Sequence, residues 1–368
     1  MAGNKVETVV TKVRCTFSHF APLLRVAPSS RCSAPPLTQR ARAVTLVSRH
    51  GKTVYCEGTG LQNDGSEASL TDAPVALRPD TIFRIYSMSK PITSAALMTL
   101  YEEGLFQLSD PLWLHLGDAW KKDNMEVYVS GHPKEGHERG PFKTEPCAKT
   151  MTIVDVLTHS SGLSYGFDPE GILNPVDAVY AAHAREMNGV PLLEWSDKLA
   201  KLPLFFQPQA AWHCAPPTPA QLHMRVSNHD CADGYNTDVC GALVEKISGM
   251  PFEEYLRQKI FSPLGMVDTA FWVPPNKRHR FADVYSENPN PAKIRAGEAL
   301  VNISTGPGQL EYIGEAPPVF SSGGGGLVAT MHDCACSAPL LLRLVTSSDA
   351  SALGCADARF CQCIANGG

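Results

Sequence analysis

The chain has 368 residues, of which 43% are hydrophobic and 19% charged, and its formal net charge is −5. This length can bury one large core or two lobes, and the charge balance excludes the basic footprint of a nucleic-acid-binding protein and a polybasic membrane patch. The apolar runs are shorter than the roughly 18 residues that a membrane-spanning helix needs. We therefore expect no nucleic-acid partner and no membrane span.

The N-terminal stretch from residue 9 to residue 44 contains no Asp or Glu. Its basic residues are Lys12, Arg14, Arg25, Arg31, Arg40 and Arg42. An arginine-rich, acid-free start with several serines is typical of an organelle transit peptide. We therefore interpret residues 1–42 as an N-terminal extension, disordered or targeting. The compartment stays open between cytoplasm and organelle.

The first predicted elements are two strands joined by a turn, over residues 43–48 and 53–58. A helix is expected at 89–104, because apolar residues recur there at helical spacing, Pro91 lies in the first turn and Gly104 ends the run. Further helical segments are predicted at 152–159, 191–202, 234–249 and 252–266. The chain begins with strands, continues with helices and then reaches a glycine-rich segment. This order indicates an α+β fold with an inserted helical lobe.

Ser87 and Lys90 form an S-x-x-K motif where the predicted helix begins. Residues three apart share a helix face, so the lysine amine can reach the serine hydroxyl. A serine becomes nucleophilic when a base accepts its proton, and a lysine serves as that base when burial or neighbouring cations lower its pKa. The helix N-terminus offers N–H groups to a developing oxyanion. The alternative is that Ser87 and Lys90 are an exposed pair without a catalytic role on an ordinary helix. We assign the neighbouring Tyr86 to packing.

The surrounding segment, RPDTIFRIYSMSKPITSAALMTLYEEGLFQLSDPL, resembles the nucleophile segment of the β-lactamase-related serine hydrolases. This superfamily contains class C β-lactamases, D-alanyl-D-alanine carboxypeptidases and esterases of β-lactamase fold. Further similar segments follow in order at 152–167, 238–275 and 320–333, so that the resemblance covers most of residues 43–333. It implies a β-lactamase/transpeptidase-like α+β fold. An antiparallel sheet lobe (43–86 and about 270–368) would be flanked by helices, with a helical lobe (about 87–269) inserted.

The resemblance also implies a serine hydrolase that works through an acyl-enzyme, with Ser87 as nucleophile and Lys90 as base. The stretches RIYSMSKP and PLGMVDTAFWVPP are similar to the esterase branch, so a small ester or amide is the expected substrate. Neither a metal nor an organic cofactor is implied. Two alternatives remain open: a non-catalytic binding or scaffold protein of this fold, and an acyltransferase that uses the same residues.

A tyrosine that shares the proton traffic is expected five residues before Asp238, but Asp233 occupies that position. A carboxylate there would hold Lys90 protonated and weaken it as a base. Tyr235 is two positions away from this place in the sequence. If the segment is helical, its side chain lies on the wrong face for the site; if the segment is a loop, it can reach the site. We therefore name Tyr235 as the third candidate catalytic residue.

Two segments, 215–233 and 335–357, each begin with the alanine of a Cys-Ala pair, after Cys214 and Cys334, and end in Cys-Ala-Asp. Deleting the first and interpreting Cys214 as tyrosine restores the expected tyrosine five positions before Asp238. A tyrosine codon that an intron divides would give both the Cys-Ala start and the Cys-Ala-Asp end when the intron is translated. Our hypothesis is therefore that two retained introns are translated in frame. The alternative is two genuine loop insertions. For residues 15–42, a third segment translated in error is an alternative to the transit-peptide interpretation.

The remaining features receive structural interpretations. His159 is expected to be structural rather than a triad base. The run Gly323–Gly326 lacks the Gly-Lys-Ser/Thr of a phosphate loop and is expected to form a tight turn beside the active site. The family's late strand, with its lysine-threonine-glycine box or a substitute, has no counterpart before Gly368. We therefore expect a C-terminally truncated domain.

Overall fold

The computed structural model describes residues 9–12, 42–49, 52–187, 189–212, 235–288, 293, 300–306 and 308–337. The first suspected insert, and all but residues 335–337 of the second, lie outside these ranges. The chain divides into two compact units. The sheet unit comprises Met1–Arg84, Trp272–Ala316 and Val328–Pro339, and the helical unit comprises Ile85–Phe271, Pro317–Leu327 and Leu340–Gly368.

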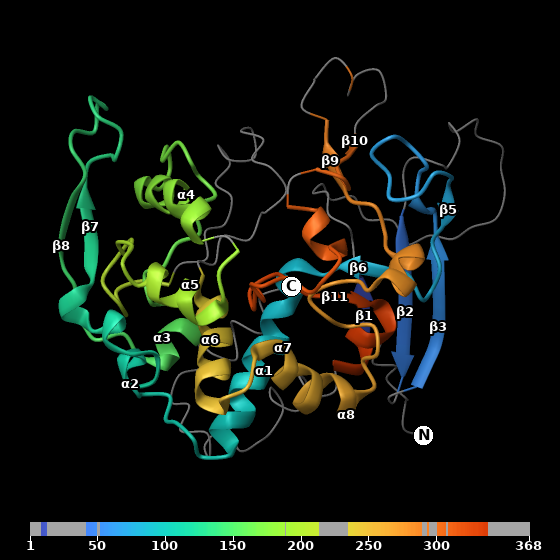
Figure 1. The fold of residues 1–368 in the computed structure, drawn as a ribbon, viewed down its shortest axis with the longest axis horizontal. Helices are drawn as coiled ribbons and strands as arrows, with labels where there is room; N and C mark the ends of the chain where they lie inside the picture. Colours follow the sequence, from blue (N-terminus) through green and yellow to red (C-terminus); the bar gives the residue numbers. More distant parts are fainter. Residues whose placement is uncertain are drawn as a thin grey trace, which may run out of the picture. The chain divides into compact units, whose positions relative to one another are not determined.

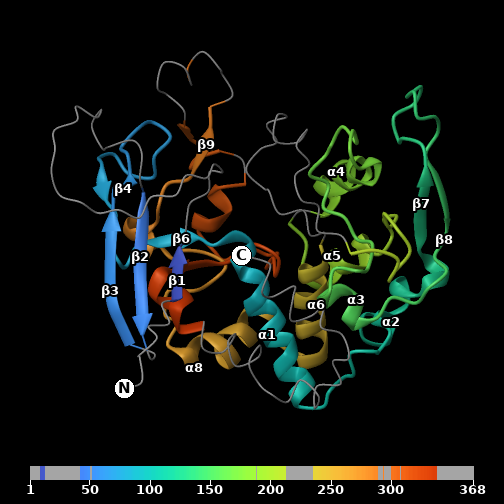
Figure 2. The ribbon, with the colours of Figure 1, turned by 180° about the vertical axis from the view of Figure 1, so that it is seen from behind.

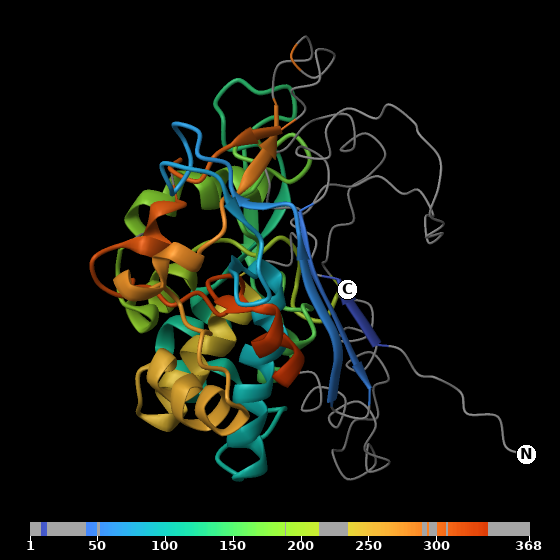
Figure 3. The same ribbon diagram turned by 90° about the vertical axis from the view of Figure 1, so that its right-hand side faces the viewer.

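The largest sheet of the sheet unit is antiparallel, in the order β1 (Val9–Lys12), β2 (Ala43–Arg49), β3 (Lys52–Thr59) (Figure 3). The predicted β2–β3 hairpin is confirmed. Strand β1 was not predicted, and it lies inside the segment interpreted as an N-terminal extension. Its four residues pair with residues 45–48 of β2. Four residues are too few to display the alternation that identifies a strand in a sequence.

Three short antiparallel pairs complete the sheet unit. They join β4 (Leu61–Asn63) to β5 (Val75–Ala76), β9 (Tyr285–Glu287) to β10 (Leu300–Asn302), and β6 (Ile82–Arg84) to β11 (Val328–Thr330). The β6–β11 pair brings together segments that are far apart in the sequence. Because β6 ends three residues before Ser87, the pair anchors the strand that leads to the nucleophile. These antiparallel pairs confirm the expected antiparallel character of the sheet lobe.

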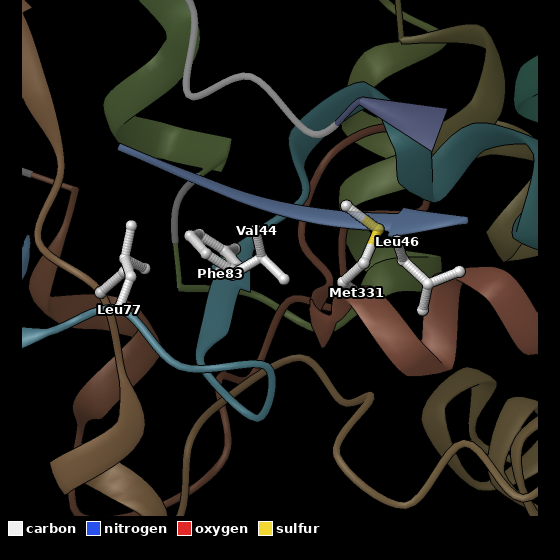
Figure 4. Packing of buried hydrophobic residues seen from close by; sticks show 6 residues of the cluster. Val44, Leu46, Leu77, Phe83 and Met331 are labelled. Atoms are coloured by element: carbon white, nitrogen blue, oxygen red, sulfur yellow. The ribbon is translucent and has the colours of Figure 1, made fainter. Parts of the chain in front are cut away.

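The core of the sheet unit forms on one face of β2. Val44 and Leu46 alternate inward and pack against Leu77, Phe83 and Met331, all of them buried (Figure 4). The alternation is the period of two that a half-buried strand requires. Met331 belongs to a helical segment, residues 331–337, that directly follows β11. The cluster therefore packs that segment, β2 and β6 together.

The helical unit is centred on two helices, α1 (Ser89–Glu102) and α6 (Asn236–Ser248), which lie side by side (Figures 1 and 2). Both were predicted. Helix α6 buries Val239, Leu243 and Val244 completely and ends at Gly249, whose φ of 69° suits a residue without a Cβ. The interface of the two helices places the start of α1 beside the first turn of α6.

The other elements of this unit are shorter. They are α2 (Leu112–Leu116), α3 (Ile153–Leu157), α4 (Pro175–Met187), α5 (Leu192–Leu199), α7 (Phe252–Leu256), a π-helical stretch (Arg257–Phe261), α8 (Ser262–Leu264), and the strands β7 (Glu126–Ser130) and β8 (Lys143–Pro146). The helices expected at 152–159 and 191–202 are confirmed in shortened form by α3 and α5. The helix predicted at 252–266 is divided by the π-helical stretch. Within the described ranges, no helix combines the length and apolar character needed to cross a membrane.

Candidate active site

Ser87 lies in a single 3₁₀ turn, Tyr86–Met88, that runs directly into α1. Tyr86, assigned to packing from the sequence, has a backbone φ of 44°, which is unusual for a residue with a side chain. Such strain costs about 1–3 kcal/mol and is concentrated at functional sites. The turn puts Ser87 at the N-terminal end of a 14-residue helix, where the positive end of the helix dipole favours developing negative charge.

Lys90 lies one helical turn beyond the serine, as the motif predicts. Its Nζ donates to Ser87 Oγ at 2.8 Å and to the carbonyl oxygen of Gly324 at 3.0 Å. Both side chains are half-buried, so substrate can approach while bulk water is partly excluded. The structure therefore brings the two sequence-predicted residues into direct contact, within the reach needed for proton transfer.

The segment Ser322–Leu327, here called the glycine loop, is held by the first turns of α1. Thr93 Oγ1 donates to the Gly323 carbonyl at 2.8 Å, and the Leu327 N–H donates to Ser89 Oγ at 3.1 Å. Ser89 and Thr93 are both fully buried. The Gly326 N–H closes a turn onto the Ser322 carbonyl at 3.0 Å. The expected tight turn beside Lys90 is thus confirmed.

Asp238, in the first turn of α6, binds the glycine loop from the other side. Its Oδ1 accepts from Ser322 Oγ at 2.6 Å and from the Gly324 N–H at 3.1 Å. The side chain is 1% exposed. Burial raises the pKa of Asp238, and the opposing effects are these two hydrogen bonds and the charge of Lys90. The sequence analysis used Asp238 as a marker for the missing tyrosine and did not identify it as part of the site.

The packing of the loop explains its run of glycines. A Cβ on Gly323 would lie 2.6 Å from the Thr237 carbonyl oxygen, and one on Gly324 would lie 2.8 Å from Asp238 Oδ2. Neither distance is compatible with a side chain. Glycine therefore allows the loop backbone to approach both α1 and α6 closely.

Tyr235, the third sequence-predicted residue, caps the N-terminus of α6, and its ring lies among other aromatic rings. The centroids of Tyr165, Trp195 and Tyr180 are 4.8, 5.0 and 6.2 Å from it. Burial raises the pKa of the Tyr235 phenol well above its ordinary range. A phenol in this environment is a poor proton acceptor. Cys214 and Asp233 lie outside the described residues.

A tyrosine that the sequence analysis missed, Tyr165, lies near the lysine. Lys90 Nζ is 5.9 Å from the centroid of the Tyr165 ring. The Tyr165 hydroxyl oxygen is 3.1 Å from the point that a Cβ on Gly324 would occupy. Tyr165 belongs to TIVDVLTHSSGLSYGF, the second segment that resembles the family, and this membership is the signal that could have identified it. In the same segment His159 follows α3 with a φ of 57°, a conformation that ends a helix.

No cluster of three or more His, Cys, Asp or Glu side chains among the described residues is arranged to hold a metal ion. The described cysteines, Cys56, Cys147, Cys240, Cys334 and Cys336, are free thiols. The residues around Lys90 offer nucleophilic chemistry. The Ser87 hydroxyl, the Lys90 amine and the Gly324 carbonyl are in hydrogen-bonding contact at the start of α1.

An antiparallel sheet lobe, an inserted helical lobe and a Ser-Lys pair at a helix start define the β-lactamase/transpeptidase fold class. The family model described as Beta-lactamase matches residues 34–215 and 233–350, and the chain belongs to this family. It is 30% identical over 292 residues to Protein Rv1367c of Mycobacterium tuberculosis (79% of this chain, 59% of that protein). It is 28% identical over 296 residues to Esterase EstB of Burkholderia gladioli (79% of this chain, 63% of that protein).

Among solved structures, simvastatin synthase (LovD) from Aspergillus terreus matches with a TM-score of 0.57 and 22% identity, over 82% of this chain and 63% of that one. This likeness concerns the fold. The chain spans about three fifths of the length of the curated relatives that it matches.

Proposed function

We propose that this protein is a serine hydrolase that cleaves a small ester or amide through an acyl-enzyme. The observation that carries the proposal is the 2.8 Å contact between Lys90 Nζ and Ser87 Oγ at the start of a buried helix. A positioned base within hydrogen-bonding distance of a hydroxyl is the requirement for an activated serine. The name of the relative Esterase EstB supports an ester as substrate.

In the proposed reaction Ser87 Oγ attacks the substrate carbonyl carbon while its proton moves to the neutral Lys90 amine. The tetrahedral intermediate carries its negative charge near the N–H groups at the start of α1. The bond to the leaving group then breaks, and Lys90 returns the proton to the departing oxygen or nitrogen. A water molecule next adds to the acyl carbon, gives its proton to Lys90, and displaces Ser87, which recovers that proton. An alcohol in place of water would give acyl transfer.

A fluorophosphonate probe, which reacts with activated serines, tests the nucleophile. We expect the probe to label Ser87, with hydrolysis of p-nitrophenyl acetate or butyrate in parallel. Ser87→Ala should abolish both, and Ser130→Ala, at an exposed serine at the end of β7, is the matched control. Adding butanol and measuring butyl ester separates transfer from hydrolysis. An unlabelled, inactive but folded protein would instead support the non-catalytic interpretation.

We further propose that residues 215–233 interrupt the catalytic domain. In support, the family match breaks between residues 215 and 233. The corresponding proposal for residues 335–357 has less support, because the match continues to residue 350. Deleting 215–233 together with Cys214→Tyr should accelerate labelling of Ser87, whereas the same deletion with Cys214→Phe, which lacks the hydroxyl, should not. Equal rates for the two deletion variants would refute the proposal that a tyrosine belongs there.

A further inference from the structure

The Gly324–Gly325 peptide group is the part of the glycine loop that faces the catalytic lysine. Its carbonyl, from Gly324, accepts the hydrogen bond of Lys90 Nζ at 3.0 Å. Its N–H, from Gly325, donates to Ser322 Oγ at 3.2 Å. The Ser322 hydroxyl in turn donates to Asp238 Oδ1 at 2.6 Å. A continuous chain of hydrogen bonds therefore connects Asp238 to the amine of Lys90.

Asp238 also holds the preceding peptide group, because its Oδ1 accepts the Gly324 N–H at 3.1 Å. Both peptide planes that flank Gly324 are thus tied to one carboxylate. This matters because glycine has no side chain to restrict its backbone, so the direction of the Gly324 carbonyl depends on external contacts. Asp238 is 1% exposed, and a buried carboxylate with these partners is a fixed anchor.

The direction of that carbonyl decides how the lysine can act. A lysine that accepts a proton is a neutral amine with two N–H bonds and one lone pair. When one N–H points to the Gly324 oxygen, rotation of the amine is restricted and the lone pair can face Ser87 Oγ, 2.8 Å away. When the carbonyl turns away, the amine loses this restraint on rotation about its Cε–Nζ bond. The productive orientation then becomes one of several.

We propose that Asp238 is a positioning residue which, through Ser322 and the Gly324–Gly325 peptide group, directs the Lys90 amine at Ser87. This inference rests on the proposed serine-hydrolase function and adds a residue that does not touch the reacting atoms. Its effect should therefore fall on the activation of Ser87 and spare the binding of the substrate.

Asp155 provides a matched control within the same unit. It is 2% exposed and also anchors its surroundings, since it accepts hydrogen bonds from the Thr152 N–H, from Thr152 Oγ1 and from Ser160 Oγ. None of these partners contacts Lys90 or Tyr165 in the hydrogen bonds described above. Asp155→Ala consequently reproduces the loss of a buried anchoring carboxylate without the connection to the amine.

The first measurement is inactivation by a fluorophosphonate, resolved into the maximal rate constant and the half-saturating concentration. For Asp238→Ala and Ser322→Ala we expect the rate constant to fall on the order of tenfold to a hundredfold, with half-saturation changed by less than about twofold. Asp238→Asn and Ser322→Thr keep the acceptor and the hydroxyl, respectively, and should restore most of the rate. Asp155→Ala should retain the wild-type rate constant.

The second measurement does not depend on activity. With [ε-¹³C]lysine, the NMR signal of Lys90 is assigned by its absence in Lys90→Met. The signal should be displaced by the Tyr165 ring, whose centroid is 5.9 Å from the amine. It should move in Asp238→Ala and in Ser322→Ala and stay in place in Asp155→Ala, because only the first two release the amine.

The outcomes separate the two proposals. A wild-type protein that is not labelled would reject the serine-hydrolase function, and the lysine signal alone would then decide whether Asp238 orients the amine. A rate constant and a Lys90 signal that are both unchanged in Ser322→Ala and Asp238→Ala would overturn the inference. So would an equal change of both in Asp155→Ala. If Asp238→Ala does not fold, the comparison of Ser322→Ala with Ser322→Thr decides.

Discussion

Gly324→Ala should disable the site without removing any functional group from it. The added Cβ would lie 2.8 Å from Asp238 Oδ2 and 3.1 Å from the Tyr165 hydroxyl oxygen. Neither neighbour can move away easily, because Asp238 is buried and held by Ser322 and Tyr165 is packed against the ring of Phe167 at a centroid distance of 4.7 Å. The loop backbone must therefore shift, and with it the carbonyl that binds Lys90.

The expected magnitudes follow from this displacement. Real Cβ atoms essentially never lie closer than 3.0 Å to another heavy atom, so relief requires movements of a few tenths of an ångström. Because a misplacement of about 1 Å can cost on the order of a hundredfold in rate, we expect a loss on the order of tenfold or more. Overpacking of this kind lowers the free energy of unfolding by about 1–3 kcal/mol. The change in rate should therefore be larger than the loss of stability alone would suggest.

Gly325→Ala is the matched control, because its Cβ would lie 3.8 Å from the nearest backbone atom of Tyr86, an ordinary van der Waals contact. The assay is the rate of p-nitrophenyl ester hydrolysis at saturating substrate, with urea unfolding of each variant. We expect a large loss for Gly324→Ala and a small one for Gly325→Ala. Equal activity of the two variants would refute the reasoning that space at position 324 sets the direction of the carbonyl.

Two further predictions concern other positions. Thr93→Val leaves the buried Gly323 carbonyl without its hydrogen-bond donor and should lower the free energy of unfolding by about 1–3 kcal/mol. Thr93→Ser keeps the hydroxyl and should retain most of the wild-type stability. Urea titration compares the two variants, and equal free energies of unfolding would contradict a stabilising role for this hydrogen bond. For Asp64, burial raises the pKa, but hydrogen bonds from Ser66, Tyr285 and Asn302 outweigh it and hold the pKa below its ordinary value. The unfolded chain therefore takes up the proton first as the pH falls, and this stabilisation is lost below about pH 4. Asp64→Asn should destabilise the protein at pH 6 and much less at pH 3; a difference that is independent of pH would refute this.

The sequence was sufficient for the parts of the site that are local. Ser87 and Lys90 are three residues apart on one helix, so their contact follows from helical geometry. The contacts of Asp238 with Ser322 and Gly324 join residues more than 80 positions apart, and no periodicity in the chain reports them. The run Gly323–Gly326 predicted a tight turn beside the active site, although it did not indicate which side chains the turn would contact.

The fold shows the same division. Helices α1 and α6 were predictable because each buries a continuous apolar face and ends at a glycine. Strands β6 and β11 have three residues each, too few for a pattern, and their pairing depends on segments that are far apart in the chain. Tyr235 was chosen because it lies near the expected tyrosine in the sequence, and its aromatic neighbours come from three other segments.

The two contacts of Lys90 differ in contact order, which has a consequence for how the site assembles. The contact with Ser87 spans three residues and can form with the helix itself, whereas the contact with Gly324 spans 234 residues. Contacts of large sequence separation form late, because the entropy of closing the intervening chain must first be overcome. During refolding, helical signal should therefore return before esterase activity, since the nucleophile is paired with its base before that base is oriented.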